Sequence, residues 1–166
     1  MADVLEVSQM LANAYEPKRA NRWTLGIDGI DAFTLKEAAR PKIALGEPQE
    51  IPFMNSVRYL KGGPAKWDPV SLVLYDPIAP SASQKVMEWV RLHHESLTGR
   101  DGYHSFYTKD IDLSLLDPVG TIVEKWRGEN GFIIDADFNT QALNYAGSEP
   151  LSITLNIQCD RWILEF

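Results

Sequence analysis

Leu151-Ser152-Ile153-Thr154-Leu155-Asn156-Ile157-Gln158-Cys159-Asp160 is the most regular stretch of the chain. Apolar and polar side chains alternate throughout it, and successive side chains of a β-strand point to opposite faces of a sheet. The stretch therefore predicts a strand with one buried face and one polar, almost uncharged face. The thiol of Cys159 falls on the apolar side, where we expect a buried small hydrophobe rather than a nucleophile.

Further strands are predicted upstream of this one. Residues 111–116 alternate, Asp117-Pro118-Val119-Gly120 is a turn with proline at its favoured second position, and residues 121–126 pair back. Gly128-Glu129-Asn130-Gly131 predicts a second turn before a strand over residues 132–138. The C-terminal part is therefore expected to be antiparallel β-structure.

The N-terminal part combines helices and strands. We expect a short helix over residues 3–15, a hairpin over residues 23–35 turning at Asp28-Gly29, and a strand over residues 67–75. Ser81 and Gln84 form a capping box before a helix over residues 82–98, which Gly99 is placed to end. The pattern predicts an α+β fold: an antiparallel β-barrel or sandwich with one main flanking helix and a short N-terminal helix.

Residues 38–66 are too long for an ordinary connection and predict an inserted arm, a long β-hairpin within a single domain of residues 1–166. Its large apolar residues suggest a subunit interface, whereas the alternative is a solvated loop. These residues are Ile51, Phe53, Met54, Val57, Tyr59 and Leu60. Six bases over residues 36–66 face three acids, so the arm complements an acidic C-terminal half and favours contact between copies of the chain.

The charge distribution argues against tight nucleic-acid binding. The chain carries 16 Lys plus Arg and 23 Asp plus Glu, and the whole net charge of −7 lies in residues 101–166. Affinity for a phosphate backbone comes mainly from cations, so this half repels it. The single cysteine excludes an intramolecular disulfide, and short apolar runs without a secretory signal predict synthesis in a cytosol and no membrane insertion.

No motif for catalysis or for a cofactor emerges, so we expect neither an enzyme nor a metal site. His93 and His94 are adjacent on the predicted helix and point about 100° apart, so they cannot chelate one ion together. Asp135 and Asp137 lie two residues apart on one strand and share a face. They form either an acid/base dyad or, more ordinarily, a solvated strand face.

The order of the elements resembles the tail tube protein family of contractile-tailed bacteriophages. The resemblance rests on Ala14-Tyr15-Glu16-Pro17 leading to Trp23-Thr24-Leu25-Gly26-Ile27, on Phe53-Met54-Asn55 in the arm, and on residues 67–76 followed by the helix with Trp89. The later strands, residues 117–126, 131–137 and 151–160, complete the match. The order and spacing of these segments carry the resemblance over most of the chain.

This resemblance implies a ring-forming tail tube fold. Six subunits would form a ring whose sheets close into one barrel around a channel, and stacked rings would form a tube within the virion tail. The subunits would be synthesised in the host bacterial cytoplasm. Partners would be further copies, sheath, baseplate and neck proteins, and the tape-measure protein, while DNA would pass through without specific binding. We place Asp135, Asp137, Thr154, Asn156 and Gln158 on the channel wall.

Three other functions stay open. The first is the inner tube of a type VI secretion or extracellular contractile injection machine, and the second is a tube-initiating or tube-terminating protein of the baseplate or neck. The third, from another class, is a monomeric β-barrel that binds a small ligand. Neighbouring genes, copy number per particle and mass in solution discriminate among them.

Overall fold

The computed structural model of the protein describes residues 16–166, and the helix predicted for residues 3–15 lies outside them. The framework is an antiparallel sheet with strand order β1-β10-β11-β12-β7-β2, to which β13 adds beside β11. These strands are β1 Trp23–Ile27, β2 Leu35–Ala38, β7 Val70–Tyr75, β10 Lys109–Leu116, β11 Ile122–Asp137, β12 Ser152–Gln158 and β13 Arg161–Leu164. The predicted α+β class is thus confirmed, but the sheet stays open, since β1 and β2 end it without pairing with each other.

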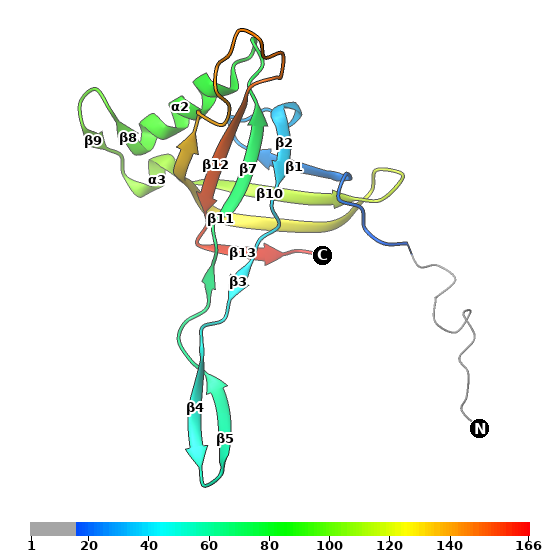
Figure 1. Cartoon of the computed structure of the whole chain (residues 1–166), viewed down its shortest axis with the longest axis vertical. Coiled ribbons are helices and arrows are strands. Elements are labelled where there is room, and N and C mark those ends of the chain that lie inside the picture. The colour runs from blue at the N-terminus through cyan, green and yellow to red at the C-terminus, as the bar shows by residue number, and fades with distance from the viewer. Residues whose placement is uncertain (1–15) are drawn as a thin grey trace.

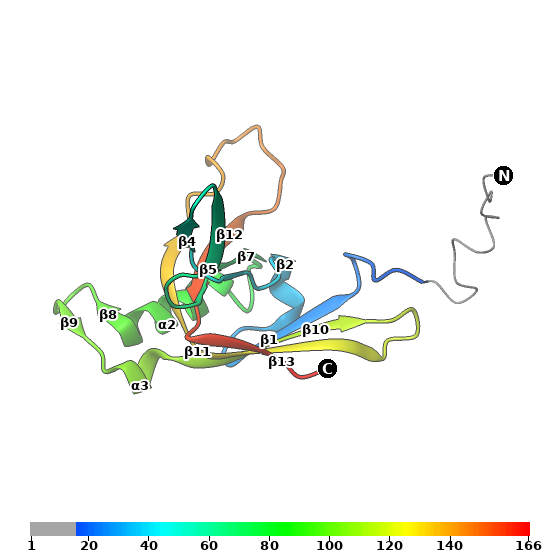
Figure 2. The same cartoon turned by 90° about the horizontal axis from the view of Figure 1, so that it is seen from below.

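Strand β11 belongs to two layers of this sheet because it changes direction along its length. Its first part pairs with β10 and β13, and residues 132–137 pair with β12. In Figure 1, β1, β10, β13 and the first part of β11 run across the molecule, while β2, β7 and β12 run upright. Seen from below in Figure 2, the first group lies together as one thin layer. The two layers enclose the core between them.

The turn predicted at residues 128–131 is wrong, because β11 continues through it. Asn130 has a φ of 52°, and the register between β10 and β11 shifts between Lys109 and Ile111. An irregularity of this kind bends a strand without ending it. A Cβ atom at Gly131 would lie 2.8 Å from Ile111 Cδ1 and 3.0 Å from the Lys109 carbonyl oxygen. Close packing, not chain reversal, therefore requires glycine there.

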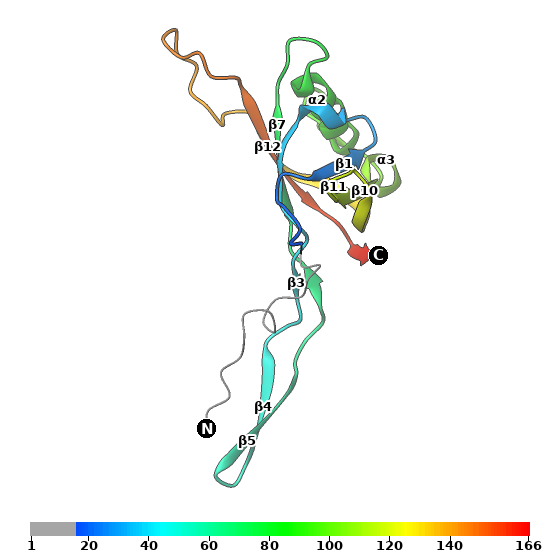
Figure 3. The same ribbon diagram turned by 90° about the vertical axis from the view of Figure 1, so that its right-hand side faces the viewer.

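The core confirms the alternation predicted for the strand at residues 151–160 from Ile153 onwards, whereas Leu151 is 44% exposed because it lies before β12, and Ser152 is buried. Ile153, Leu155, Ile157 and Cys159 are all buried. They join Leu72 and Leu74 of β7 and Val86 and Trp89 of helix α2, Ala82–His93, in one cluster. Figure 3 shows α2, β1 and β10 on one side of the upright β7–β12 layer. The apolar face of β12 is buried because the helix and the second layer both cover that side.

The hairpin predicted over residues 23–35 is wrong in its second strand. The chain does turn after β1, with a φ of +84° at Gly29 and a hydrogen bond from Ile30 N to Ile27 O. A 3-10 turn at Ala32–Thr34 follows, and β2 then pairs with β7 rather than with β1. Strand β1 pairs instead with β10, far along the chain. The alternation alone could not distinguish these partners.

Helix α2 begins as predicted and ends early. The Ser81 hydroxyl accepts a hydrogen bond from the Gln84 backbone N–H at 3.4 Å. The helix stops at His93 instead of residue 98, because the next residues form a small hairpin of β8, His94–Glu95, and β9, Arg100–Asp101. Gly99, with a φ of +67°, lies in the turn of that hairpin. Helix α3, His104–Tyr107, then leads into β10.

The arm is a hairpin that projects from the body, as Figure 1 shows at its lower end. Its root pairs β3, Ile43–Ala44, with β6, Lys66–Trp67, and its outer part pairs β4, Pro48–Phe53, with β5, Ser56–Lys61. Between root and outer part the two chains touch at Gly46, where a Cβ would lie 2.2 Å from the Gly62 carbonyl oxygen. Only glycine allows this backbone contact.

Candidate assembly surfaces

The predicted channel residues lie on one face of the sheet, which we call the outer face. Asp135 is paired with Asn156, and Asp137 with Thr154, across β11 and β12. The Asn156 amide donates to Asp135 Oδ2 at 3.4 Å. Both carboxylates are exposed, and the β12 side chains are half-buried. The structure therefore brings these four side chains together on the side opposite the core.

Gln158, the fifth predicted channel residue, has a different environment. Its amide donates to the Trp67 carbonyl oxygen at 3.0 Å and to its own neighbour, the Cys159 carbonyl oxygen, at 2.9 Å. Gln158 thus lies against the root of the arm, where it contacts β6, the strand that returns from the arm to the body.

Strands β2 and β7 extend the outer face with residues that the sequence analysis did not select. Ser71 is paired with Asn156, Val73 with Thr154, and Glu37 with Val73. Lys36 lies over the Tyr75 ring at 5.5 Å from its centroid. The alternation in Val70–Tyr75 marks this face in the sequence, but which strand lies beside it does not follow from one sequence.

The four-stranded layer β11-β12-β7-β2 has two open edges. Within residues 16–166, β2 pairs only with β7, and residues 132–137 of β11 pair only with β12. Such edges present unpaired N–H and C=O groups, so they are templates for another strand. The layer can therefore be continued on either side by a neighbouring chain.

The outer part of the arm exposes every residue of β4 and β5. Phe53 and Met54, at its tip, have exposed fractions of 71% and 92%. The other predicted interface residues, Ile51, Val57, Tyr59 and Leu60, are exposed as well. Apolar side chains concentrated on a projecting element mark a contact surface.

A shallow pocket of about 370 Å³ is lined by residues at the end of β7 and the start of β12. Figure 1 shows these ends of the two strands on the side of the sheet away from the arm. The lining of the pocket includes Phe33, Tyr75, Pro77 and Leu151. It therefore combines apolar rings and side chains where β7 ends and β12 begins. We call it the head pocket.

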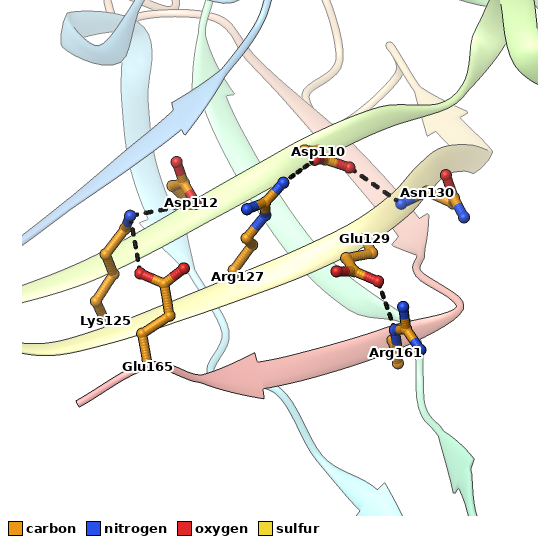
Figure 4. Close-up of polar contacts among 8 residues, drawn as sticks. All are labelled: Asp110, Asp112, Lys125, Arg127, Glu129, Asn130, Arg161 and Glu165. Carbon is orange, nitrogen blue, oxygen red and sulfur yellow. Dashed lines mark hydrogen bonds and ion pairs between the residues drawn. The ribbon is translucent and has the colours of Figure 1, made fainter.

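The layer of β10, β11 and β13 carries a ladder of ion pairs on its exposed side (Figure 4). Arg127 pairs with Asp110 at 2.8 Å, Arg161 pairs with Glu129, and Lys125 lies 3.0 Å from Glu165. The Arg127 guanidinium lowers the pKa of Asp110, against the smaller opposing effect of desolvation. Because each cation has an anionic partner, this side is a hydrated face with its charges already paired.

Glu124 is the buried carboxylate among the charged residues of the described chain, and the sequence analysis did not single it out. It pairs with Lys18, accepts from the Arg40 guanidinium at 2.5 Å and accepts from the Trp126 indole N–H at 2.6 Å. Desolvation acts to raise its pKa, but the hydrogen bonds from Lys18, Trp126 and Arg40 outweigh it and lower the pKa to about 2. Glu124 is therefore held ionised.

The residues screened for chemistry occupy structural positions. His93 stacks on Tyr107 with ring centroids 4.2 Å apart, and His94 pairs with Asp101 at 2.7 Å. Burial raises the pKa of the Cys159 thiol to about 12. Within residues 16–166, no three His, Cys, Asp or Glu side chains gather as metal ligands. No helix in the same range is long and apolar enough to cross a membrane.

Comparison with known proteins places this fold among tube assemblies. No family model matches the sequence, and no curated protein matches it either. A chain of the anti-feeding prophage tube terminating cap superposes with a TM-score of 0.68 and 15% identity, covering 97% of this chain and 99% of its own. A chain of the sheath-tube complex of the extracellular contractile injection system PVC gives 0.64 and 15%, covering 98% and 99%.

Hcp1 from Flavobacterium johnsoniae is a more distant match, with a TM-score of 0.52, 10% identity and coverage of 87% of this chain and 94% of that one. The expected tube-like fold is thus confirmed, since the chain shares its fold, over nearly its whole length, with chains of a sheath-tube complex and of a tube terminating cap.

Proposed function

We propose that this protein is a structural subunit of the tube of a contractile tail or injection assembly. The observation that carries the proposal is the four-stranded layer with two open edges and a polar outer face, within a fold shared with sheath-tube and tube-cap assemblies. Within residues 16–166 both edges of this layer lack a partner strand, which favours self-association.

The two open edges of the layer, β2 and residues 132–137 of β11, can pair between neighbouring copies and so close a ring. If β2 of one copy pairs with residues 132–137 of the next copy, the same contact repeats around a ring and closes the sheet into a barrel. We propose six copies per ring, on the basis of the resemblance to tail tube proteins. The outer face, with Asp135, Asp137, Thr154 and Asn156, then lines the channel.

The chemistry of this face suits transport. Glu37, Asp135 and Asp137 are opposed by one cation, Lys36, among the outer-face residues identified above. A wall with more acids than bases holds no phosphate backbone, so DNA slides along it without specific binding. Gln158 lies at the arm root in the free subunit, and we place it at the rim of the channel.

The arm supplies the contact between stacked rings. The turn between β4 and β5, next to Phe53, and the strand ends that line the head pocket lie at opposite ends of the molecule (Figure 1). A head-to-tail contact between them would therefore repeat from ring to ring without closing. Residues 38–66 carry five bases and two acids, and the rest of the chain is strongly acidic. Charge complementarity therefore supports the same contact.

The first test is the mass of the purified protein by light scattering after size exclusion, with the same fractions viewed by negative-stain electron microscopy. Rings of about six subunits or hollow filaments would support the proposal. A monomer that stays monomeric at high concentration and with baseplate extract would overturn it and favour a small-ligand-binding protein.

A tube subunit and a tube terminator differ in the number of copies that each particle contains. The sheath-tube match and the cap match have similar TM-scores, 0.64 and 0.68, so both a tube subunit and a tube terminator fit the fold. We propose the tube subunit, in a virion tail or an injection particle, with sheath, baseplate, neck and tape-measure partners. Many copies per purified particle would support it, and a single ring would favour the terminator.

A further inference from the structure

Among residues 16–166, the arm is held to the body through its root. All residues of β4 and β5 are exposed, so nothing in residues 16–166 supports the outer part from the side. The root itself pairs over two residues on each chain, Ile43 with Trp67 and Ala44 with Lys66. The direction of the arm therefore depends on how the root is fixed to the sheet.

The two chains of the root are fixed by neighbouring residues of β11. Arg40, on the outgoing chain, donates to Glu124 at 2.5 Å. Trp67, on the returning chain, packs edge-to-face on Trp126 with ring centroids 6.4 Å apart. Trp126 in turn donates to Glu124 at 2.6 Å, so the contacts to the two chains are joined. We call these four residues, Arg40, Trp67, Glu124 and Trp126, the root clamp.

The two residues of the root clamp that belong to the body, Glu124 and Trp126, lie within the paired part of the sheet. Glu124 and Trp126 are both paired with β10, opposite Leu115 and Leu113, and Trp126 is also paired with Leu164 of β13. The side chain of Glu124 is only 6% exposed, so the carboxylate is shielded from water, while the Lys18 and Arg40 side chains that reach it are 49% and 60% exposed. Lys18, from the segment before β1, binds its second oxygen and prevents the carboxylate from turning away.

We propose that Glu124 is a positioning residue that fixes the direction of the arm in the free subunit, through Arg40 and Trp126, before any second copy is bound. This inference rests on the proposed function, because the pre-oriented arm is the element that meets the next ring. Pre-orientation removes part of the ordering cost that association would otherwise incur. The clamp therefore promotes assembly without contributing to the contact itself.

The test uses Arg40→Ala, which removes one donor and leaves Glu124 with Lys18 and Trp126. The matched control is Lys42→Ala, which removes a cation from the same root, where Lys42 pairs with Asp68 at 2.7 Å and not with Glu124. Spin labels at Met54→Cys and Val119→Cys report the distance from arm tip to body in protein diluted below the assembly threshold. The native thiol of Cys159 is buried and stays unlabelled.

We expect Arg40→Ala to broaden the distance distribution and, without the labels, to raise the concentration needed for assembly roughly tenfold. Lys42→Ala should leave both values unchanged, and thermal unfolding should show that all three proteins are folded at the temperature of the distance measurement. An unchanged distribution in Arg40→Ala, or an equal change in Lys42→Ala, would overturn the inference. The distance measurement needs no assembly, so failure of the wild-type protein to assemble would count against the proposed function alone.

Discussion

Glu124 is the residue whose charge matters most to this fold. Its pKa is about 2, below the ordinary value of 4.5 that applies in the unfolded chain. A lowered pKa stabilises the folded state above pH 4.5, and this stabilisation is lost as the pH falls towards 2. We expect Glu124→Gln to lower the free energy of unfolding by roughly 2 kcal/mol at pH 7, with the difference from wild type closing between pH 4.5 and pH 2.

Urea unfolding at a series of pH values measures this difference. Glu149→Gln, at an exposed carboxylate, is the control and should differ little from wild type at any pH. A difference that stays constant from pH 7 to pH 2 would mean that Glu124 acts through packing and not through its charge.

Leu155 lies at the centre of β12, paired with Ala136 and Leu72, and its side chain has an exposed fraction of 0%. Truncation would leave a cavity between the layers, so we expect Leu155→Ala to cost about 2–5 kcal/mol of unfolding free energy. Asn156→Ala, one residue further on the outer face, should cost well under half as much. Chemical denaturation of the two variants checks the assignment of buried and outer faces.

At the scale of elements, the bend in β11 decides how the two layers meet. Alanine at Gly131 would bring a Cβ against Ile111, the Lys109 carbonyl oxygen and Cys159. We therefore expect Gly131→Ala to destabilise the protein by about 1–3 kcal/mol. Gly147→Ala is the control, because the nearest atom to its Cβ would be 3.4 Å away. Equal midpoints in thermal unfolding would show that the bend tolerates a side chain.

The elements also show which parts of the fold the sequence could predict. Alternation of period two predicted β10, β12 and the buried face that includes Ile153, because regularly spaced apolar residues mark the buried side of a strand whichever strands lie beside it. Partner choice was not predictable: residues 31–35 read as the return strand of a hairpin, yet β2 pairs with β7. Gly128 and Gly131 read as a turn because glycine serves both chain reversal and close packing.

The candidate site also has one part that the sequence could predict and one part that it could not. The shared face of Asp135 and Asp137 follows from their spacing, and the structure pairs them with Asn156 and Thr154. Glu124 could not be found from the sequence, since its three donors come from residues 18, 40 and 126. Only the fold brings these segments together.

At the scale of the whole molecule, we expect substitutions at the arm tip to affect assembly without affecting folding. We expect the double variant Phe53→Asp and Met54→Asp to abolish filaments while leaving the thermal midpoint within a few degrees of wild type, because both side chains are exposed. Val119→Asp, at an equally exposed apolar residue in the β10–β11 turn, is the control. Filaments from the double variant in electron micrographs would exclude the arm tip from the contact.

The position of β12 has a consequence for the time at which a subunit becomes complete. β12 lies between β11 and β7, although β7 is made long before it along the chain. While the ribosome is still synthesising the chain, β7 has one neighbour in the sheet, β2, and its other side is vacant. The four-stranded layer is therefore incomplete on a nascent chain until β12 has been made, so we expect ring contacts that use this layer to form only once synthesis is nearly finished.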